Sequence, residues 1–189
     1  MAAAGLRWRR PGRPLTRAAS LGTAAHVFHE LGSGVGMPLA SVVGPLPAAA
    51  AWTTGTAAVV GSAGRADGSH DRAFASLNGV YLSVIIGHYV AWPWTRKWLP
   101  WLADCEGLGA DRMPVYNAIL YVSGGAALAG LLLENRGGRA FAAALPVVLV
   151  PVAVLAQRSE FRRLQELAWR RPGWWNRRLR RAVRLSRSA

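Results

Sequence analysis

Ionisable side chains are concentrated in one otherwise apolar segment near the N-terminus. Counted from His26, the side chains of His29, Glu30 and Ser33 follow at offsets of three, four and seven residues, which places all of them along one face of a helix. An ionised group at membrane depth costs at least about 2.5–3.5 kcal/mol, so Glu30 has to be neutral, paired or close to an interface. A neutral carboxylic acid in a dry site can donate a proton, and the adjacent histidines can return it. A Glu–His pair that only joins two helices is the alternative interpretation.

Two later apolar segments carry polar and aromatic side chains on one helical face in the same way. The candidates for substrate binding are Tyr81, His88 and Trp92 in the segment 73–92, and Tyr116, Asn117 and Tyr121 in the segment 113–133. Contact with lipid is unfavourable for polar groups, so these faces are expected to line the interior of a helix bundle. Ring faces attract cations, and a dry interior keeps water from quenching a reactive intermediate. The pattern therefore indicates an apolar substrate that passes through a cationic intermediate, with ordinary interhelical hydrogen bonding as the alternative.

The histidines also allow a haem hypothesis, because His26, His29 and His88 could supply ligands between helices. Zinc and di-iron sites are not expected, since the sequence has neither an HExxH motif nor paired ExxH motifs. Cys105 is the only cysteine, which rules out an intramolecular disulfide and a cysteine pair at metal-ligand spacing. We therefore predict no metal and no cofactor, and keep a haem-binding or a structural membrane subunit without catalysis as the alternative function.

The overall composition indicates a membrane protein. Of the 189 residues, 52% are hydrophobic and only 17% are charged, and the charges gather at the two ends and in short loops. The formal net charge of +14 would suit nucleic acid, but long apolar stretches separate the basic clusters. Basic flanks that orient helices and contact anionic lipid headgroups explain the charge better. We therefore predict membrane lipid as a partner and no nucleic acid.

The sequence contains five apolar segments, at residues 24–43, 48–63, 73–92, 113–133 and 140–156. A spanning helix needs about 20 residues, a length that the third and fourth segments reach easily and the second and fifth barely. This pattern predicts an all-α fold, a polytopic transmembrane helix bundle with about five membrane helices. The predicted parts of the chain are a basic N-terminal segment (1–22), the transmembrane bundle (23–157) and a basic cytoplasmic tail (158–189).

Charge also predicts the orientation of the chain. Eleven arginines follow Gln157, which places the tail in the cytoplasm by the positive-inside rule, and we predict an integral protein of the inner (cell) membrane. The N-terminal arginines between Arg7 and Arg17 favour the same side, although five spans would put the two ends on opposite sides. Either one of the first two segments is re-entrant or interfacial, or the N-terminal signal is overridden. No small-residue cleavage site follows, so we expect the N-terminal segment to be retained.

A family resemblance adds to this reading of the residues. The motifs HELGSGVGMPLAS, PWLADCEGL, MPVYNAILY, LLLENR and PGWWNRRL together resemble the small membrane-bound terpene cyclases of actinobacterial indole-terpenoid biosynthesis, the drimentine type. The similarity covers most of residues 26–180. It implies cyclisation of a prenyl chain, commonly a farnesyl group on an indole-bearing molecule, that begins with protonation of a terminal alkene. No diphosphate leaves in this chemistry, which agrees with the absence of a DDxxD-like magnesium motif.

The resemblance also implies roles for individual residues. The resemblance implies that one acid in the matching motifs is the proton donor. The four candidates are Glu30, Asp104, Glu106 and Glu134. The residue pattern itself favours Glu30, because it lies deepest in an apolar segment and has His26 and His29 within one turn. The expected stabilisers of the cation are the rings of Tyr81, Trp92, Tyr116 and Tyr121. The predicted function is a membrane-bound terpene cyclase for a hydrophobic prenylated small molecule, and a proton-transfer isomerase of a sterol-like lipid is a further alternative.

Overall fold

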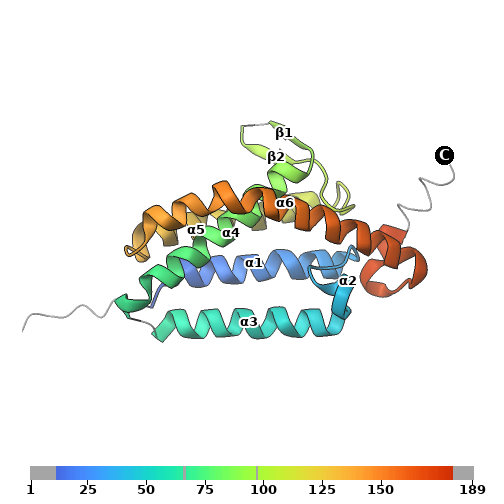
Figure 1. Cartoon of the computed structure of the whole chain (residues 1–189). Helices are drawn as coiled ribbons and strands as arrows, with labels where there is room; N and C mark the ends of the chain where they lie inside the picture. The colour runs from blue at the N-terminus through green and yellow to red at the C-terminus, as the bar shows by residue number, and fades with distance from the viewer. Residues whose placement is uncertain (1–11, 66, 97, 181–189) are drawn as a thin grey trace, which may run out of the picture.

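A computed structural model describes residues 12–65, 67–96 and 98–180 of the chain (Figure 1). The five long helices are α1 (Pro14–Ser33), α3 (Pro45–Arg65), α4 (Asp71–Ala91), α5 (Met113–Ala129) and α6 (Arg139–Arg170). Shorter elements are α2 (Ala40–Val43), the 3₁₀ turns Gly68–His70 and Trp174–Asn176, a π-helical turn at Gly130–Glu134, and an antiparallel hairpin of β1 (Trp94–Arg96) and β2 (Pro100–Leu102). The predicted all-α fold is confirmed.

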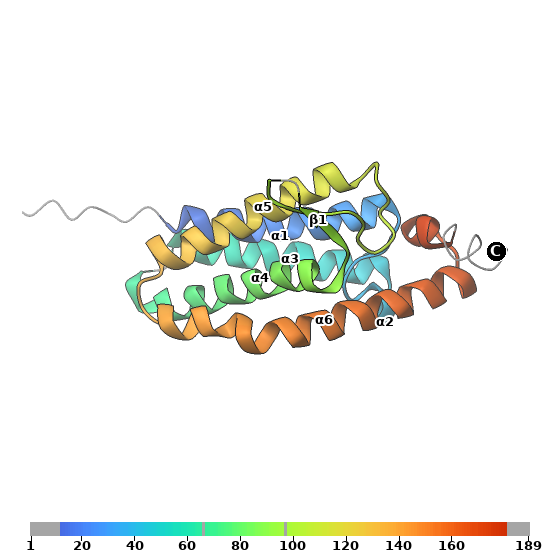
Figure 2. The ribbon, with the colours of Figure 1, turned by 90° about the horizontal axis from the view of Figure 1, so that it is seen from above.

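Helix α1 lies inside the bundle, with α3 on one side and α4, α5 and α6 on the other (Figure 1). It packs along α5 and α3, while α4 packs mainly along α6, as the view from above shows (Figure 2). The largest group of buried side chains includes Val27, Met37, Tyr116 and Leu120, and so joins α1 to α5. The segment with the ionisable cluster is therefore the helix that the other helices surround.

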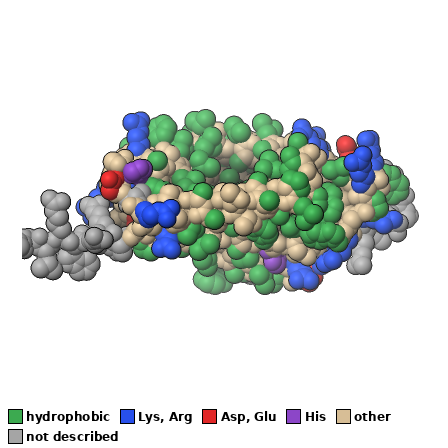
Figure 3. Space-filling model, turned by 90° about the horizontal axis from the view of Figure 1, so that it is seen from below, with side chains coloured by type: hydrophobic (Ala, Val, Ile, Leu, Met, Phe, Trp, Pro, Cys, Tyr) green, Lys and Arg blue, Asp and Glu red, His purple; other side chains and the backbone are tan. Residues whose placement is uncertain are grey.

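Three helices among the described residues are long and apolar enough to cross a membrane: Gly68–Ala91, Met113–Glu134 and Arg139–Arg170. Helix α6 exposes aliphatic side chains along its length, with Val147 80% and Leu155 70% exposed, which is the composition of a surface that contacts lipid. On the face that carries α3, basic side chains gather at the two ends and leave a largely uncharged band between them (Figure 3). Where the sequence predicted about five membrane helices, the structure has three candidates, because α1 carries ionisable groups and α3 is rich in alanine, glycine and threonine.

The first helix begins and ends about ten residues earlier than the predicted segment 24–43. Pro14 occupies its first turn, where a missing N–H costs nothing. Gly34 ends it in the left-handed conformation (φ 81°), with its N–H donating to the Leu31 carbonyl at 3.0 Å. The predicted boundary between residues 22 and 23 thus falls inside α1, and the one between 157 and 158 falls inside α6. Helix α6 ends at Arg170, just before Pro172.

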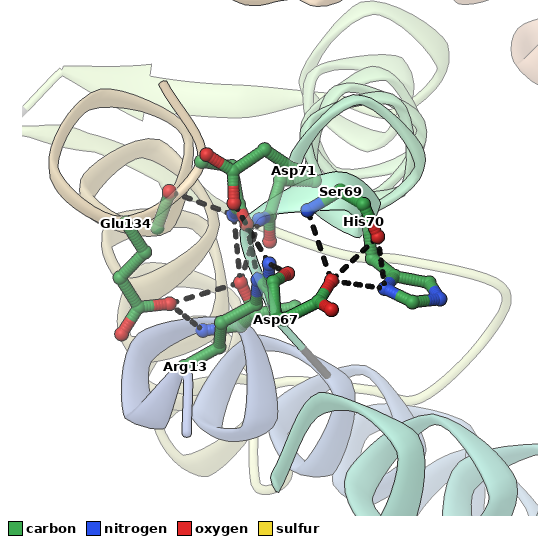
Figure 4. A network of polar contacts seen from close by, with 10 residues as sticks. Arg13, Asp67, Ser69, His70, Asp71 and Glu134 are labelled. Atoms are coloured by element: carbon green, nitrogen blue, oxygen red, sulfur yellow. Dashed lines mark hydrogen bonds and ion pairs between the residues drawn. The ribbon is translucent and has the colours of Figure 1, made fainter. Parts of the chain in front are cut away.

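Arg13 explains why the first helix extends into the basic N-terminal segment. Its guanidinium is 6% exposed and donates from Nη2 to Asp71 Oδ1 at 2.7 Å and from Nε to Asn135 Oδ1 at 2.9 Å. These contacts hold the start of α1 against the start of α4 and the end of α5 (Figure 4). The predictions for Arg7 and for the last tail arginines concern residues outside the described ranges.

The long loop between α4 and α5 folds over one end of the bundle through the β1–β2 hairpin, which the sequence did not predict. Asn117 fixes the hairpin to α5, because its amide accepts from the Leu102 N–H at 2.9 Å and donates to the Leu102 carbonyl at 3.1 Å. The residues after β2, Cys105 and Glu106, are buried against the bundle. The loop therefore brings an acid and a thiol to the same end as Glu30.

Candidate functional site

Four polar or titratable side chains from three helices meet in the interior at this end. His26 and Glu30 come from α1, His88 from α4 and Tyr116 from α5, and their exposed fractions are 3%, 1%, 2% and 0%. The spacing of four residues places His26 and Glu30 one turn apart on the same face of α1. We call these four residues the buried cluster.

Glu30 is held by a short hydrogen bond. The Tyr116 hydroxyl donates to Glu30 Oε1 at 2.5 Å, and the Cys105 thiol donates to the Tyr116 oxygen at 3.5 Å. His26 Nε2 lies 3.8 Å from Glu30 Oε1. Among the described residues, no arginine or lysine forms an ion pair with Glu30. The carboxyl group therefore sits in a nearly water-free environment with a phenol and imidazoles as its neighbours.

The two histidine rings of the buried cluster are in direct contact. The ring centroids of His26 and His88 are 5.2 Å apart in an edge-to-face arrangement, and each ring lies about 6 Å from the Tyr116 ring. His88 Nδ1 lies 2.8 Å from the Val84 carbonyl oxygen, so in the neutral ring this nitrogen carries the proton and Nε2 is left as an acceptor. One potential ligand atom from each of His26, Glu30 and His88 falls within 4.8 Å of the others, a spacing that also suits a metal ion.

A second carboxyl group, that of Glu106, adjoins the cluster from the loop. Its backbone is in the left-handed region (φ 52°), which is uncommon for a residue other than glycine. Burial raises the pKa of Glu106 to about 8, and the nearby carboxylate of Glu160 acts in the same direction. Burial also raises the pKa of Cys105, with the carboxyls of Glu106 and Glu30 adding to the effect. Cys105 is therefore close to both acids.

The other two candidate proton donors lie elsewhere. Asp104 is partly exposed and accepts the Gly109 N–H at 3.2 Å within its own loop. Glu134 accepts from the N–H groups of Leu15 and Thr16 at 2.6 and 2.9 Å, and from the Thr16 hydroxyl at 3.0 Å (Figure 4). Fifteen residues of helix, about 22 Å, separate Leu15 from Glu30. Glu134 thus caps the far end of α1.

Of the predicted substrate-binding residues, some lie in the buried cluster and others lie outside it. His88 and Tyr116 belong to the buried cluster, and His29 lies beside it, with its ring centroid 6.1 Å from that of Tyr116. The others are engaged outside the cluster. The Tyr81 hydroxyl donates to Ser20 at 3.2 Å, Trp92 packs edge to face on Phe161 at 5.0 Å, Asn117 holds Leu102, and Tyr121 donates to the Pro100 carbonyl.

Residues of α6 close to the site were missed from the sequence. Gln157 Nε2 lies 3.2 Å from His88 Nδ1, and Glu160 accepts from the Ser41 N–H at 3.1 Å and from its hydroxyl. Their spacing of three residues on one helical face was the available signal, but the surrounding arginines assigned this stretch to the basic cytoplasmic tail. No protein-family model, curated protein or solved structure matches this chain.

Proposed function

We propose that the protein is an integral membrane terpene cyclase in which Glu30 protonates an alkene of a prenylated substrate of the farnesyl-indole type. The observation that supports this most is the position of Glu30, which is 1% exposed, has no cationic partner among the described residues and accepts a hydrogen bond from Tyr116. A carboxyl group in such surroundings favours its neutral form, because an unpaired buried carboxylate is costly. The family resemblance of the sequence motifs points to the same reaction.

The first step transfers the proton of the Glu30 carboxyl group to the terminal alkene carbon. The alkene π electrons form the new C–H bond, which leaves a tertiary carbocation on the substrate and a carboxylate on Glu30. The Tyr116 hydroxyl, 2.5 Å from Glu30 Oε1, then donates to an ionised acceptor, and such charge-assisted hydrogen bonds are the stronger kind. Tyr116 thus lowers the energy of the charge that forms on the enzyme.

Ring closure and loss of a proton complete the reaction. The π electrons of a second alkene attack the cation and form a C–C bond, and the final cation loses a proton from an adjacent carbon to a neutral histidine. His26, with Nε2 3.8 Å from Glu30 Oε1, is placed to accept that proton and return it to Glu30. The rings around Glu30 attract the cation, and the buried position excludes water. Substrate and product have the same composition, so no cofactor is required.

The same proposal places the five long helices in the inner membrane. Helices α4, α5 and α6 cross it, and α1 and α3 complete the bundle at membrane depth. The polar face of α1 then contacts protein instead of lipid, as the cost of an exposed ionisable group requires. The arginine-rich tail lies on the cytoplasmic side.

Purified variants incubated with a farnesylated indole test the role of Glu30. Glu30→Gln keeps the shape of the side chain but removes the transferable proton, so cyclised product should fall by at least about 100-fold. Glu30→Asp should retain a small fraction. Glu134→Gln, the matched control, should turn over normally because Glu134 caps α1. Cyclisation leaves the mass unchanged, so chromatographic retention is the readout, and wild-type turnover by Glu30→Gln would refute the assignment.

A metal centre is the second candidate, favoured by the mutual spacing of His26, Glu30 and His88 within 4.8 Å. A metal ion would take the place of the proton on Glu30, so the two candidates exclude each other. Stoichiometric metal in the purified protein that is lost on His88→Ala would support it. A haem between His26 and His88 fits less well, because the two rings already touch edge to face at 5.2 Å. A Soret band in the wild-type protein that disappears in His29→Ala or His88→Ala would instead support haem binding.

A further inference from the structure

A separate cavity of about 310 Å³ lies between α1, α3 and α4. Its walls include Ser20, Thr23, Trp52, Gly55, Val59 and Tyr81. This volume falls at the lower end of the range for small-molecule sites, about 300–1,000 Å³. The reaction proposed for the buried cluster uses Glu30 and its neighbours and assigns no role to this space.

Three hydrogen-bond donors in the cavity wall are directed at the protein. The Tyr81 hydroxyl donates to Ser20 Oγ at 3.2 Å, and the Thr23 hydroxyl donates to the Ala19 carbonyl at 2.9 Å. The Trp52 indole N–H donates to the Pro38 carbonyl at 3.3 Å. A ligand would therefore meet mainly methyl groups, methylenes and ring faces, with the hydroxyls of Ser20 and Thr56 as the remaining polar groups. Such a cavity suits a hydrocarbon, because burial of apolar surface against an apolar wall is favourable.

The cavity is aligned with the proposed proton donor along α1. Thr23 and Glu30 are seven residues apart, which is two helical turns and about 10 Å along the same face. Trp52 contributes to the cavity wall and also packs against the core cluster that contains Val27, the residue between them on this face. The cavity wall at Thr23 therefore lies two turns of α1 from Glu30, with the buried side chain of Val27 between them.

The cavity opens on the outside of the bundle at α3. Leu39 is 52% exposed, and Ala51 and Gly55, which also line the cavity, are exposed. A Cβ atom added at Gly55 would meet no atom within 4 Å. Helix α3 forms one edge of the bundle (Figure 1), and its exposed residues Ala51 and Gly55 place the opening on the outer surface of the protein.

We propose that the cavity between α1, α3 and α4 binds the isoprenoid chain of the substrate, which enters from the bilayer past α3 and extends toward Glu30. The identity of the chain rests on the proposed function. Its hydrocarbon character rests on the cavity wall, and its direction of entry rests on the opening at Gly55.

A farnesyl chain that carries a diazirine, added to the protein in lipid nanodiscs, tests the assignment by binding alone. After illumination, mass spectrometry of peptides should locate adducts at Trp52 and Tyr81, and an excess of unlabelled farnesylated indole should suppress them. Outward-facing Val80, 38% exposed, reports contact with bulk lipid and should not respond to the competitor. This map of the wild-type protein needs no substitution.

Two glycine substitutions provide a matched pair. Gly55→Leu fills the cavity, and labelling should fall by about tenfold, the loss expected when two chain carbons no longer fit. Gly125→Leu in α5 is the control, because a Cβ there also meets nothing within 4 Å but lies outside the cavity wall. Labelling of this variant should equal that of the wild type.

The outcomes separate this assignment from the proposed function. Absence of competable adducts at Trp52 and Tyr81, or equal labelling of the two glycine variants, would overturn the cavity assignment. Competable labelling together with normal labelling of Glu30→Gln, which forms no cyclised product, supports both proposals. Competable labelling by a wild-type protein that never forms product would leave the cavity assignment standing and reject the cyclase.

Discussion

Removing the Glu134 carboxylate should destabilise the protein without affecting its chemistry. The residue that precedes α1, Arg13, provides no side-chain cap for the helix. Glu134, the last residue of the π-helical turn after α5, supplies the cap by accepting from the Leu15 N–H, the Thr16 N–H and the Thr16 hydroxyl at 2.6, 2.9 and 3.0 Å. The Thr16 oxygen already accepts from the amide of Asn78 at 2.9 Å, so its proton depends on Glu134 as acceptor. Glu134→Ala therefore leaves three donors without this partner.

The expected size follows from two contributions. Loss of an N-cap acceptor costs about 0.5–2 kcal/mol, and loss of a negative charge at a helix N-terminus costs about 0.3–1 kcal/mol. Glu134 is partly exposed, so water replaces some of the lost hydrogen bonds, and a total near 2 kcal/mol is reasonable. For a chain of this size, that corresponds to a fall in Tm of about 4–8 °C. Glu134→Gln keeps one acceptor oxygen and should lose about half as much.

The only cysteine provides the assay. Cys105 is fully buried, so a thiol-reactive fluorophore labels the protein only after it unfolds, and heating in detergent gives Tm directly. Glu166→Ala on the exposed surface of α6 is the control and should leave Tm unchanged. A Glu134→Ala protein with the same Tm as Glu166→Ala would refute the capping role. Loss of turnover in Glu134→Gln at a temperature where this variant is still folded would show that Glu134 belongs to the reaction.

Two further predictions concern pH and orientation. The folded-state pKa of Glu106, raised to about 8 by burial and by Glu160, exceeds its unfolded value near 4.3, so ionisation favours unfolding. The stability that Glu106 contributes is complete below about pH 4.3 and is lost as the pH rises toward about 8. Melting curves followed by circular dichroism should show this fall in Tm with pH. In Glu106→Gln, this part of the pH dependence of Tm should be absent. A reporter fused after Ser188 should be cytoplasmic because eleven arginines precede it, and a periplasmic signal would contradict this orientation.

The sequence was most informative where the structure depends on local pattern. The segments 73–92 and 113–133 correspond closely to α4 and to α5 with its π-helical end, because uninterrupted apolar runs and nearby prolines determine where such helices lie. The predicted start of α1 was wrong, because Arg13 was assigned to the basic N-terminal segment and is in fact buried against Asp71, 58 residues later.

In the candidate site, too, some features follow from the local sequence and others only from the tertiary structure. The arrangement of His26 and Glu30 on one face follows from helical periodicity, and the sequence alone determined it. The family resemblance could not rank Glu30, Asp104, Glu106 and Glu134, whereas the residue pattern favoured Glu30 because it lies deepest in an apolar segment. Only the tertiary structure puts the Tyr116 hydroxyl on Glu30 across 86 residues and assigns Glu134 to the opposite end of α1. The physical reason is that helix formation depends on neighbours within a few residues, whereas the contacts between helices depend on how their surfaces pack.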